Sequence, residues 1–364
     1  MRSAPAVIVS SGIRRFLYGV LAAIAAGCGG LLSPGQSVAA DFTWRFGTNV
    51  AESSPSYQML AETVRAIEAE SGQRLKIDIK PINGYGRPAE LMPLMDKGDI
   101  EVALVSTGYF ADRFAANSVL ELPLLYPSAV VGTKVAWQLY QDGNLDRDFR
   151  DLKVLAMWVL PPYGVFSSQR RLETVRDFRG LRIRVYSLTS GRAIARLGAI
   201  PLNVPNDRIA EALDVGALDA VTYGWESMAT TPGVGGRKLV EQVKYLLDIK
   251  YAAPELAILM KRPVFEALPA DLQAVVERHT GKALSMALAV QRDEGDAAVR
   301  AKLAADPRFV LSKLPPAEAA ATERALAPAL AEWATVVGRQ GVDGDALLAK
   351  ARTLAATANQ SEGK

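Results

Sequence analysis

Residues 42–105 read FTWRFGTNVAESSPSYQMLAETVRAIEAESGQRLKIDIKPINGYGRPAELMPLMDKGDIEVALV. Three segments have the alternating or mostly apolar pattern of β-strands, and two have the periodicity of helices. In chain order they are strand 42–48, helix 56–71, strand 75–79, helix 88–97 and strand 100–105. Gly72 and Gly98 follow the two helices, at the position where glycine often ends a helix. This β-α-β-α-β succession predicts a largely parallel sheet covered by helices.

A second block repeats the pattern further along the chain. Its predicted segments are strands 153–159, 165–168 and 181–185, helix 188–197, strand 199–203, helix 209–215 and strand 220–223. From Pro263 onward the sequence becomes helical and rich in alanine, a strong helix former. Two α/β blocks joined by extended crossings predict an α/β fold of two lobes with a ligand cleft between them and a helical C-terminal region.

The division between the lobes is expected to fall at the extended crossings. We expect residues 41–161 with about 251–295 to form lobe I, and residues 162–250 with about 296–364 to form lobe II. The crossings at Pro161-Pro162 and around Lys250 are the predicted hinge.

The first forty residues have the pattern of an export signal. Arg14 and Arg15 precede the apolar segment 16–32, and Val38-Ala39-Ala40 places small residues before a cleavage point. The apolar segment is shorter than the roughly 20 residues that span a bilayer, and a membrane anchor is the alternative. Residues 1–40 are therefore predicted to be a signal peptide and the mature protein to be periplasmic. The arginine pair also fits twin-arginine export, and Cys28 would fit a lipoprotein anchor.

The amino-acid composition excludes several kinds of catalytic site. The chain has one histidine, His279, and one cysteine, Cys28, which lies inside the predicted signal. A mature thiol nucleophile and a His/Cys zinc site are therefore excluded, and a Ser-His-Asp triad would have to use His279. That histidine lies beside Glu277 and Arg278, where a surface position is expected. Lysine and arginine total 42 against 39 acidic residues, so no basic field indicates a nucleic-acid partner.

Loops that follow predicted strands carry candidate ligand-binding side chains, because ligands of open α/β sheets bind beyond the carboxyl ends of strands. These candidates are Asn49, Tyr85, Tyr109, Tyr223 and Trp225, with Tyr163 on the crossing between the blocks. Aromatic rings with a polar group suit the wall of a small-molecule pocket. Packing in the core is the alternative for each ring.

Six short motifs occur in a fixed order along the chain. They are Lys97-Gly98-Asp99-Ile100, Glu121-Leu122-Pro123-Leu124-Leu125-Tyr126, Gly180-Leu181-Arg182-Ile183-Arg184-Val185, Leu197-Gly198-Ala199-Ile200-Pro201, Ala212-Leu213-Asp214-Val215-Gly216-Ala217-Leu218-Asp219-Ala220 and Leu268-Pro269-Ala270-Asp271-Leu272-Gln273. Together they resemble the periplasmic solute-binding proteins of tripartite ATP-independent periplasmic (TRAP) transporters, the dicarboxylate-binding-protein-like family. The resemblance implies a two-lobed periplasmic-binding-protein fold. It also implies a receptor that delivers a small carboxylate to the membrane permease subunits of a TRAP transporter.

The resemblance assigns the ligand's carboxylate to Arg184, the arginine at the end of the Leu-Arg-Ile-Arg segment. A guanidinium presents planar paired donors that match a carboxylate, and it stays charged when desolvated. Because a buried arginine without an anion is costly, a carboxylate would favour closure of the lobes. An ion pair between Arg184 and a structural acid is the alternative. Arg182 should share the same strand face and ranks second, because the family motif places lysine there.

Departures from the family pattern reduce the range of candidate substrates. Members that bind sialic acid have a second arginine near the position of Tyr163, and this chain has none there. The segment 219–223 resembles the branch that binds 2-oxo and 2-hydroxy monocarboxylates, in which an acidic residue helps to hold a cation. Thr222 stands in that place here, so no cofactor is assigned, although Glu255 could supply a carboxylate to a cation if it is not an exposed loop acid. Tyr223 and its neighbours favour a monocarboxylate with an apolar or hydroxylated tail over a dicarboxylate.

Two other functions remain open. One is an exported enzyme on the same scaffold, since a fold does not determine a function. The other is a sensory receptor that presents its ligand to a membrane signalling protein. The scarcity of histidine and cysteine argues against the enzyme. So does the lack of a phosphate-binding glycine loop, since Gly233-Val234-Gly235-Gly236 does not lie between a strand and a helix.

Overall fold

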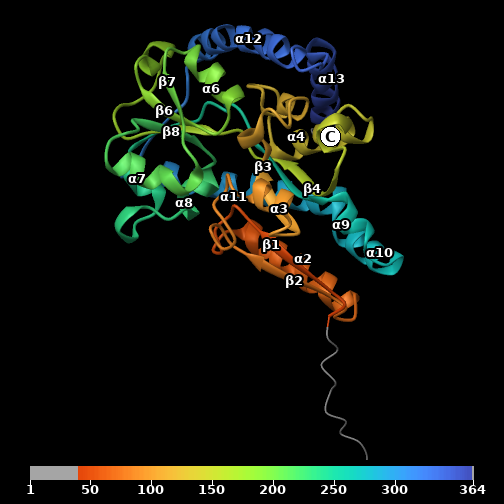
Figure 1. Cartoon of the computed structure of the whole chain (residues 1–364). Helices are drawn as coiled ribbons and strands as arrows, with labels where there is room; N and C mark the ends of the chain where they lie inside the picture. Colours follow the sequence, from red (N-terminus) through yellow and green to blue (C-terminus); the bar gives the residue numbers. More distant parts are fainter. Residues whose placement is uncertain (1–39, 363–364) are drawn as a thin grey trace, which may run out of the picture. The chain divides into compact units, whose positions relative to one another are not determined.

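The computed structural model describes residues 40–362, which contain two β-sheets (Figure 1). Apart from Ala40, the predicted signal peptide lies outside the described residues, and so does Cys28. Within residues 40–362, no helix is long and apolar enough to cross a membrane. We use lobe I for the first sheet with the helices packed on it, and lobe II for the second.

The sheet of lobe I has five strands in the order β2-β1-β3-β10-β4. These strands are β1 (Phe42–Gly47), β2 (Leu75–Lys80), β3 (Val102–Ser106), β4 (Leu152–Val159) and β10 (Glu255–Lys261). Strand β1 pairs in parallel with β2 and β3, which confirms the β-α-β-α-β prediction. Strand β10 was not predicted; it is inserted antiparallel between β3 and β4. The sheet is therefore mixed, because a strand from later in the chain completes it.

The sheet of lobe II has six strands in the order β11-β9-β5-β8-β6-β7. They are β5 (Gly164–Ser167), β6 (Arg182–Val185), β7 (Ile200–Asn203), β8 (Ala220–Tyr223), β9 (Tyr245–Leu247) and β11 (Val310–Ser312). Strand β6 pairs in parallel with β7 and β8, whereas β5 pairs antiparallel with β8 and β9. The sequence analysis missed β9 and β11, which have three residues each and show no periodicity.

Helices surround both sheets and dominate the C-terminal third of the chain (Figure 1). The α-helices are α2 (Pro55–Glu70), α3 (Leu91–Lys97), α4 (Ala129–Gln141), α5 (Asp146–Phe149), α6 (Leu188–Ala195), α7 (Ile209–Asp214), α8 (Trp225–Thr230), α9 (Arg262–Glu266), α10 (Ala270–His279), α11 (Gly281–Ala305), α12 (Pro316–Gly338) and α13 (Gly344–Glu362). The 3₁₀ turns are η1 (Thr107–Phe110), η2 (Asn117–Glu121), η3 (Val175–Phe178), η4 (Asn206–Arg208), η5 (Val234–Gly236) and η6 (Leu239–Gln242).

Helix α2 illustrates how local sequence builds the fold. The Ser54 side chain caps the helix by accepting a hydrogen bond of 3.1 Å from the Tyr57 backbone N–H, and Pro55 occupies the first turn. Both features favour a helix start. Tyr57, Leu60 and Val64 then bury one face at helical spacing. The helix therefore begins and packs where the sequence predicts.

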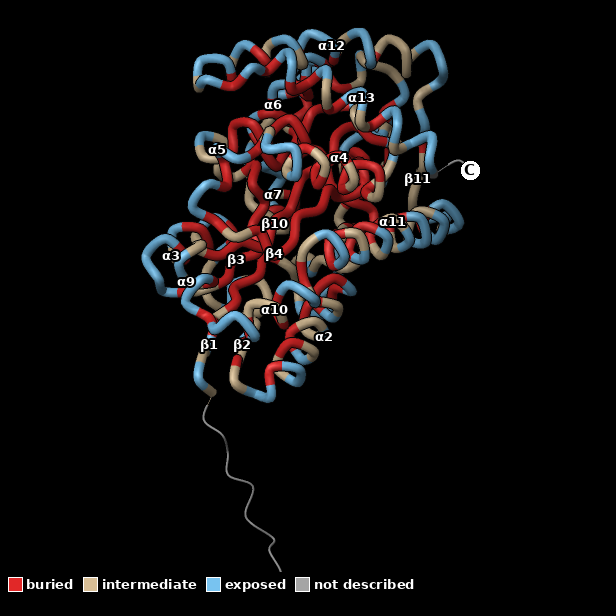
Figure 2. The backbone as a smooth tube through the Cα atoms, turned by 90° about the vertical axis from the view of Figure 1, so that its right-hand side faces the viewer, coloured by how far each residue is buried: buried red, intermediate tan, exposed pale blue. Residues whose placement is uncertain are grey.

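The central strands of lobe I are buried on both faces. Figure 2 shows β3, β4 and β10 buried along almost their whole length. In β4, Trp158 belongs to one buried cluster, whereas its neighbours Met157 and Val159 belong to the other. Opposite faces of a strand alternate by residue, so each face meets its own layer of helices. This explains why these strands are runs of apolar residues rather than alternating ones.

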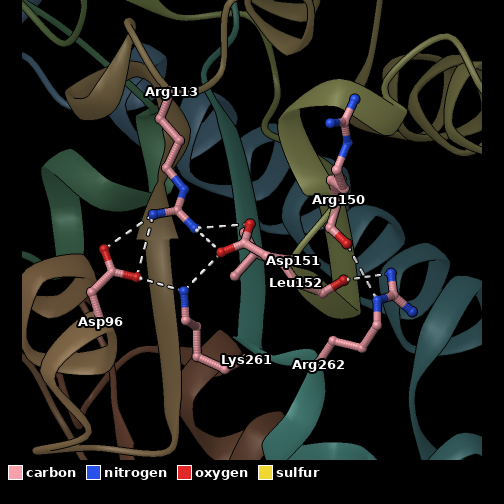
Figure 3. Close-up of polar contacts among 7 residues, drawn as sticks. All are labelled: Asp96, Arg113, Arg150, Asp151, Leu152, Lys261 and Arg262. Carbon is pink, nitrogen blue, oxygen red and sulfur yellow. Dashed lines mark hydrogen bonds and ion pairs between the residues drawn. The ribbon is translucent and has the colours of Figure 1, made fainter.

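A network of ion pairs joins the ends of β4 and β10. Arg113 and Lys261 each pair with both Asp96 and Asp151, at N···O distances of 2.7 to 3.2 Å (Figure 3). All four side chains are partly exposed, so each pair alone contributes little to stability. The network nevertheless links α3, the segment after η1 and two strands at one edge of lobe I.

Two chain crossings connect the lobes side by side. The backbone N–H of Leu160 donates to the Pro254 carbonyl at 2.9 Å, and that of Tyr163 donates to the Ala252 carbonyl at 2.9 Å. Tyr251 returns a hydrogen bond of 3.0 Å to the Tyr163 carbonyl. The segments predicted to form the hinge are therefore paired with each other.

The C-terminal helices contact both lobes. Helix α11 packs against α4 and β4 of lobe I and against α8 of lobe II. Helix α12 passes beside α6 and leads to α13, which packs on α4 (Figure 1). The predicted assignment of residues 296–364 to lobe II stays a prediction.

Candidate functional site

A cavity of about 250 Å³ lies where loops of the two lobes meet. Its walls come from the loops after β1 and β3, the crossing at 160–163, strands β6 and β8, and helices α8 and α11. The volume is slightly below the roughly 300–1,000 Å³ of drug-sized ligand pockets, so it suits a small molecule.

Arg184 is buried in this cavity without an acidic partner. Its side chain is 1% exposed and lies on β6. The guanidinium donates to the Val204 carbonyl at 2.9 Å, to the Thr222 carbonyl at 3.1 Å and to Asn206 Oδ1 at 2.7 Å. Among the described residues, no carboxylate lies within ion-pair distance of it. Neutral partners fix its orientation and leave its charge uncompensated, which is the arrangement that a bound anion would complete.

Tyrosine rings form the wall beside Arg184. The Arg184 Cζ atom lies 5.4 Å from the centre of the Tyr223 ring, within the range of a cation–π contact. The Tyr163 ring follows, with its centre 5.7 Å from that of Tyr223 and 5.3 Å from that of Tyr186. Burial raises the pKa of Tyr163 and Tyr186. The rings therefore stay neutral and add apolar surface without adding charge.

Tyr109 reaches the same cavity from lobe I. Burial raises the pKa of Tyr109, and the positive charge of Arg184 partly offsets the rise. This coupling indicates that the phenol lies close to the guanidinium of lobe II. The turn η1 and strand β6 therefore bring the two residues together from opposite lobes.

A second, charge-balanced polar group lines the cavity. Arg292 on α11 is 5% exposed and pairs with Glu226 of α8, with 3.0 Å between Nη1 and Oε2. Its Nη2 also donates to the hydroxyl of Ser227 at 2.8 Å. The sequence analysis did not find this group. A usable signal was present, because Arg292 and Asp296 fall on the buried stripe of α11 that also contains Ser285 and Leu288.

The structure brings together five of the seven predicted site residues. Those that line the cavity are Asn49, Tyr109, Tyr163, Arg184 and Tyr223. Tyr85 and Trp225 lie elsewhere: the Tyr85 hydroxyl donates to Asp78 at 2.5 Å, and Trp225 packs in the core with its ring centre 4.9 Å from that of Phe166. Arg182 forms an ion pair of 2.7 Å with Asp219 and does not line the cavity.

Glu255 is not an exposed loop acid, as one alternative held. It is the fully buried first residue of β10 and accepts hydrogen bonds from the Thr107 hydroxyl and from Asn117 Nδ2. Glu121 is buried nearby, at the end of η2, with its carboxyl group against Gly108. Burial raises the pKa of Glu121 to about 8 and that of Glu255 to about 7. Within residues 40–362, no three or more His, Cys, Asp or Glu side chains are grouped to hold a metal ion.

A family profile and a curated relative both match most of this chain. The profile of the family described as bacterial extracellular solute-binding protein, family 7, matches residues 46–335. The chain is similar to the C4-dicarboxylate-binding periplasmic protein of Rhodobacter capsulatus, with 22% identity over 302 residues, covering 82% of this chain and 88% of the relative.

Solved structures share the fold. A TRAP solute-binding protein from Rhodoferax ferrireducens T118, in complex with copurified benzoate, has 27% identity and a TM-score of 0.80, covering 88% of this chain and 99% of that protein. A marine-metagenome TRAP solute-binding protein specific for aromatic acid ligands, in complex with 3-hydroxybenzoate, has 23% identity and a TM-score of 0.80, with the same coverage. These likenesses confirm the two-lobed α/β fold.

Proposed function

Because the chain belongs to family 7 of the bacterial extracellular solute-binding proteins, we propose that it captures a small monocarboxylate around Arg184 and delivers it to the permease of a TRAP transporter. The observation that carries the proposal is the burial of Arg184 with neutral partners only. An uncompensated buried cation favours a ligand that brings one negative charge.

The charges of the cavity support a monocarboxylate over a dicarboxylate. Within residues 40–362, Arg184 has no carboxylate at ion-pair distance, whereas Glu226 already pairs with Arg292. Asp207, which also lines the cavity, adds a negative charge that a second ligand carboxylate would meet. A 2-oxo or 2-hydroxy acid, or another acid with an apolar tail, fits this balance.

The tyrosine wall supports an apolar or aromatic tail. Tyr163 and Tyr223 place ring surfaces beside the guanidinium, where a flat or apolar group would pack. The relatives from Rhodoferax ferrireducens and the marine metagenome are described with benzoate and 3-hydroxybenzoate, which are acids of this kind.

Ligand-dependent thermal stability tests the proposal. We would free residues 41–364 of copurified ligand by unfolding and refolding, then screen mono- and dicarboxylates. A ligand that binds only the folded state at 100 times its Kd adds about 2.7 kcal/mol of stability. Arg184→Gln should abolish the shift.

The matched control is Arg182→Gln, two residues earlier on the same strand, because Arg182 pairs with Asp219 outside the cavity. This variant should keep the shift. A shift that survives in Arg184→Gln, or no shift with any carboxylate, would overturn the proposal. Recovery of chemically altered ligand would instead support the exported-enzyme alternative.

A further inference from the structure

The side chains of Arg292, Glu226 and Ser227 form a polar cluster that shares no hydrogen-bond partner with Arg184. A chain of contacts connects the two arginines: Arg184 lies over Tyr223, which contacts Tyr163. The Tyr163 ring and Arg292 Nη2 both lie beside Gly224, where an added Cβ would be 3.2 Å from Tyr163 and 3.4 Å from Arg292. Tyr163 and Tyr223 therefore form the part of the cavity wall that links the two polar groups.

The Ser227 hydroxyl can act as a hydrogen-bond donor to a ligand. Its Oγ accepts the 2.8 Å hydrogen bond from Arg292, and Ser227 lines the cavity. Within residues 40–362, its hydroxyl donates to no protein acceptor. A hydroxyl that already accepts from a guanidinium is polarised and becomes a stronger donor. A ligand oxygen in the cavity could therefore accept from Ser227.

Glu226 neutralises the positive charge of Arg292 in this polar cluster. It pairs with Arg292 at 3.0 Å, and Gln291 Nε2 donates to both carboxylate oxygens at 3.2 Å. Gly295 leaves the space that the carboxylate occupies, since an added Cβ would lie 2.4 Å from Oε2. The carboxylate is held in place on three sides, so this cluster presents donors without a net charge.

We propose that Arg292, Glu226 and Ser227 form a second polar subsite that selects ligands with a neutral oxygen, such as a hydroxyl group, remote from the carboxylate. The inference rests on the proposed function, since the carboxylate must bind at Arg184. A ligand hydroxyl would accept from Ser227. A second carboxylate would lose its hydration without gaining an unpaired cation, since Glu226 already pairs with Arg292, so the subsite disfavours it.

Two ligand series test the subsite by isothermal titration calorimetry. One is benzoate, 3- and 4-hydroxybenzoate and isophthalate; the other is hexanoate, 6-hydroxyhexanoate and adipate. In at least one series, the hydroxy acid should bind more tightly than the parent acid, and the dicarboxylate more weakly. Ser227→Ala should reduce the hydroxy-to-parent affinity ratio about 5-fold, the effect of one hydrogen bond, and Ser227→Thr should restore it.

Glu226→Gln gives the opposite signature, because it removes the carboxylate that pairs with Arg292 at 3.0 Å and leaves only the more distant charge of Asp296 near it. The dicarboxylate-to-parent affinity ratio should rise at least about 10-fold, as expected when a buried cation loses its ion-pair partner. Thr230→Val is the control for loss of a nearby hydroxyl. The Thr230 hydroxyl already donates to the Glu226 carbonyl at 2.9 Å, so this variant should leave both affinity ratios unchanged.

The outcomes separate the two proposals. If monocarboxylates bind but neither ratio changes in Ser227→Ala or Glu226→Gln, the subsite is wrong and the carboxylate receptor stands. If no carboxylate binds the unsubstituted protein, the receptor proposal itself fails. Circular dichroism and the ligand-free melting temperature show whether Glu226→Gln folds, and Ser227→Ala alone decides the subsite if it does not.

Discussion

At the residue scale, the buried carboxyl groups of Glu121 and Glu255 have raised pKa values, so folding favours their protonated forms. Both raised pKa values have burial as their main cause, because a charged carboxylate is costly in a low-dielectric interior. Glu121 also feels the nearby charge of Glu255. Neither residue lines the cavity, so their effect concerns stability rather than ligand contact.

We predict that stability falls as pH rises through the pKa of Glu121. The folded pKa of about 8 lies above the unfolded value near 4.5, so the stabilisation is complete below about pH 4.5 and is lost as pH rises through about 8. One fully linked proton changes the free energy of unfolding by about 1.4 kcal/mol per pH unit. Glu121→Gln, which imitates the neutral acid, should flatten this slope in urea unfolding at pH 5 to 8. The same substitution at exposed Glu62 should leave the slope as it is, and an equal slope in both variants would contradict the prediction.

At the element scale, one turn of α11 holds the starts of two other helices. Asp293 accepts hydrogen bonds of 2.8 and 3.0 Å from the backbone N–H groups of Ala129 and Val130, at the start of α4. Asp296 accepts bonds of 3.2 and 2.9 Å from Trp225 and Glu226, at the start of α8. Carboxylates at helix N-termini are favourable, because they satisfy free N–H groups and oppose the helix dipole. Helix α11 therefore connects lobe I, lobe II and the cavity.

Gly295 tests the packing between α11 and α8. Alanine normally stabilises a helix interior by about 1 kcal/mol relative to glycine. At Gly295, however, the added Cβ would lie 2.4 Å from Glu226 Oε2, so we expect Gly295→Ala to destabilise the protein by about 1–3 kcal/mol. The same change at Gly338, the last residue of α12, meets no atom within 4 Å and should stabilise it slightly. Chemical unfolding of both variants measures the contrast, and a stabilised Gly295→Ala would show that Glu226 moves aside freely.

At the scale of the whole molecule, the paired crossings are the predicted hinge between the lobes. Lys250 and Leu124 have positive φ angles of 47° and 60° beside these crossings, which residues with side chains seldom adopt. The Leu124 backbone N–H donates to the Tyr251 carbonyl at 3.1 Å, so this segment joins the crossings. Two unusual backbone conformations therefore lie beside the hydrogen-bonded crossings of the predicted hinge.

We predict that a bound carboxylate shifts the lobes toward a closed state. Arg184 of lobe II and Tyr109 of lobe I share the cavity, and an anion between them would favour the closed arrangement. Small-angle X-ray scattering of residues 41–364 should show a smaller radius of gyration with saturating ligand. Arg184→Gln should show no change under the same conditions. An unchanged radius in the unsubstituted protein, with binding confirmed by calorimetry, would contradict closure.

Much of the fold and the principal candidate binding residue were predictable from local signals. Strands β1, β2, β4 and β6 and helices α2 and α6 follow the apolar periodicity closely, because each buries one face or both faces against a neighbour. Arg184 was predicted from its motif, and the structure places it in the cavity. Three predicted tyrosines and Asn49 join it, since loops after strands of an α/β sheet converge on one edge.

Local patterns were enough to predict the two α/β blocks, the helical C-terminal region and Arg184 as the ligand-binding candidate, because periodicity and short motifs involve residues close together in the chain. Three features became visible only in the folded chain: β10 completes the first sheet, Trp225 packs in the core, and Arg292 lines the cavity with Glu226 as its partner. These features depend on contacts between residues far apart in the chain. Pairing and burial between distant segments leave no periodic signal, so they appear only when the chain is folded.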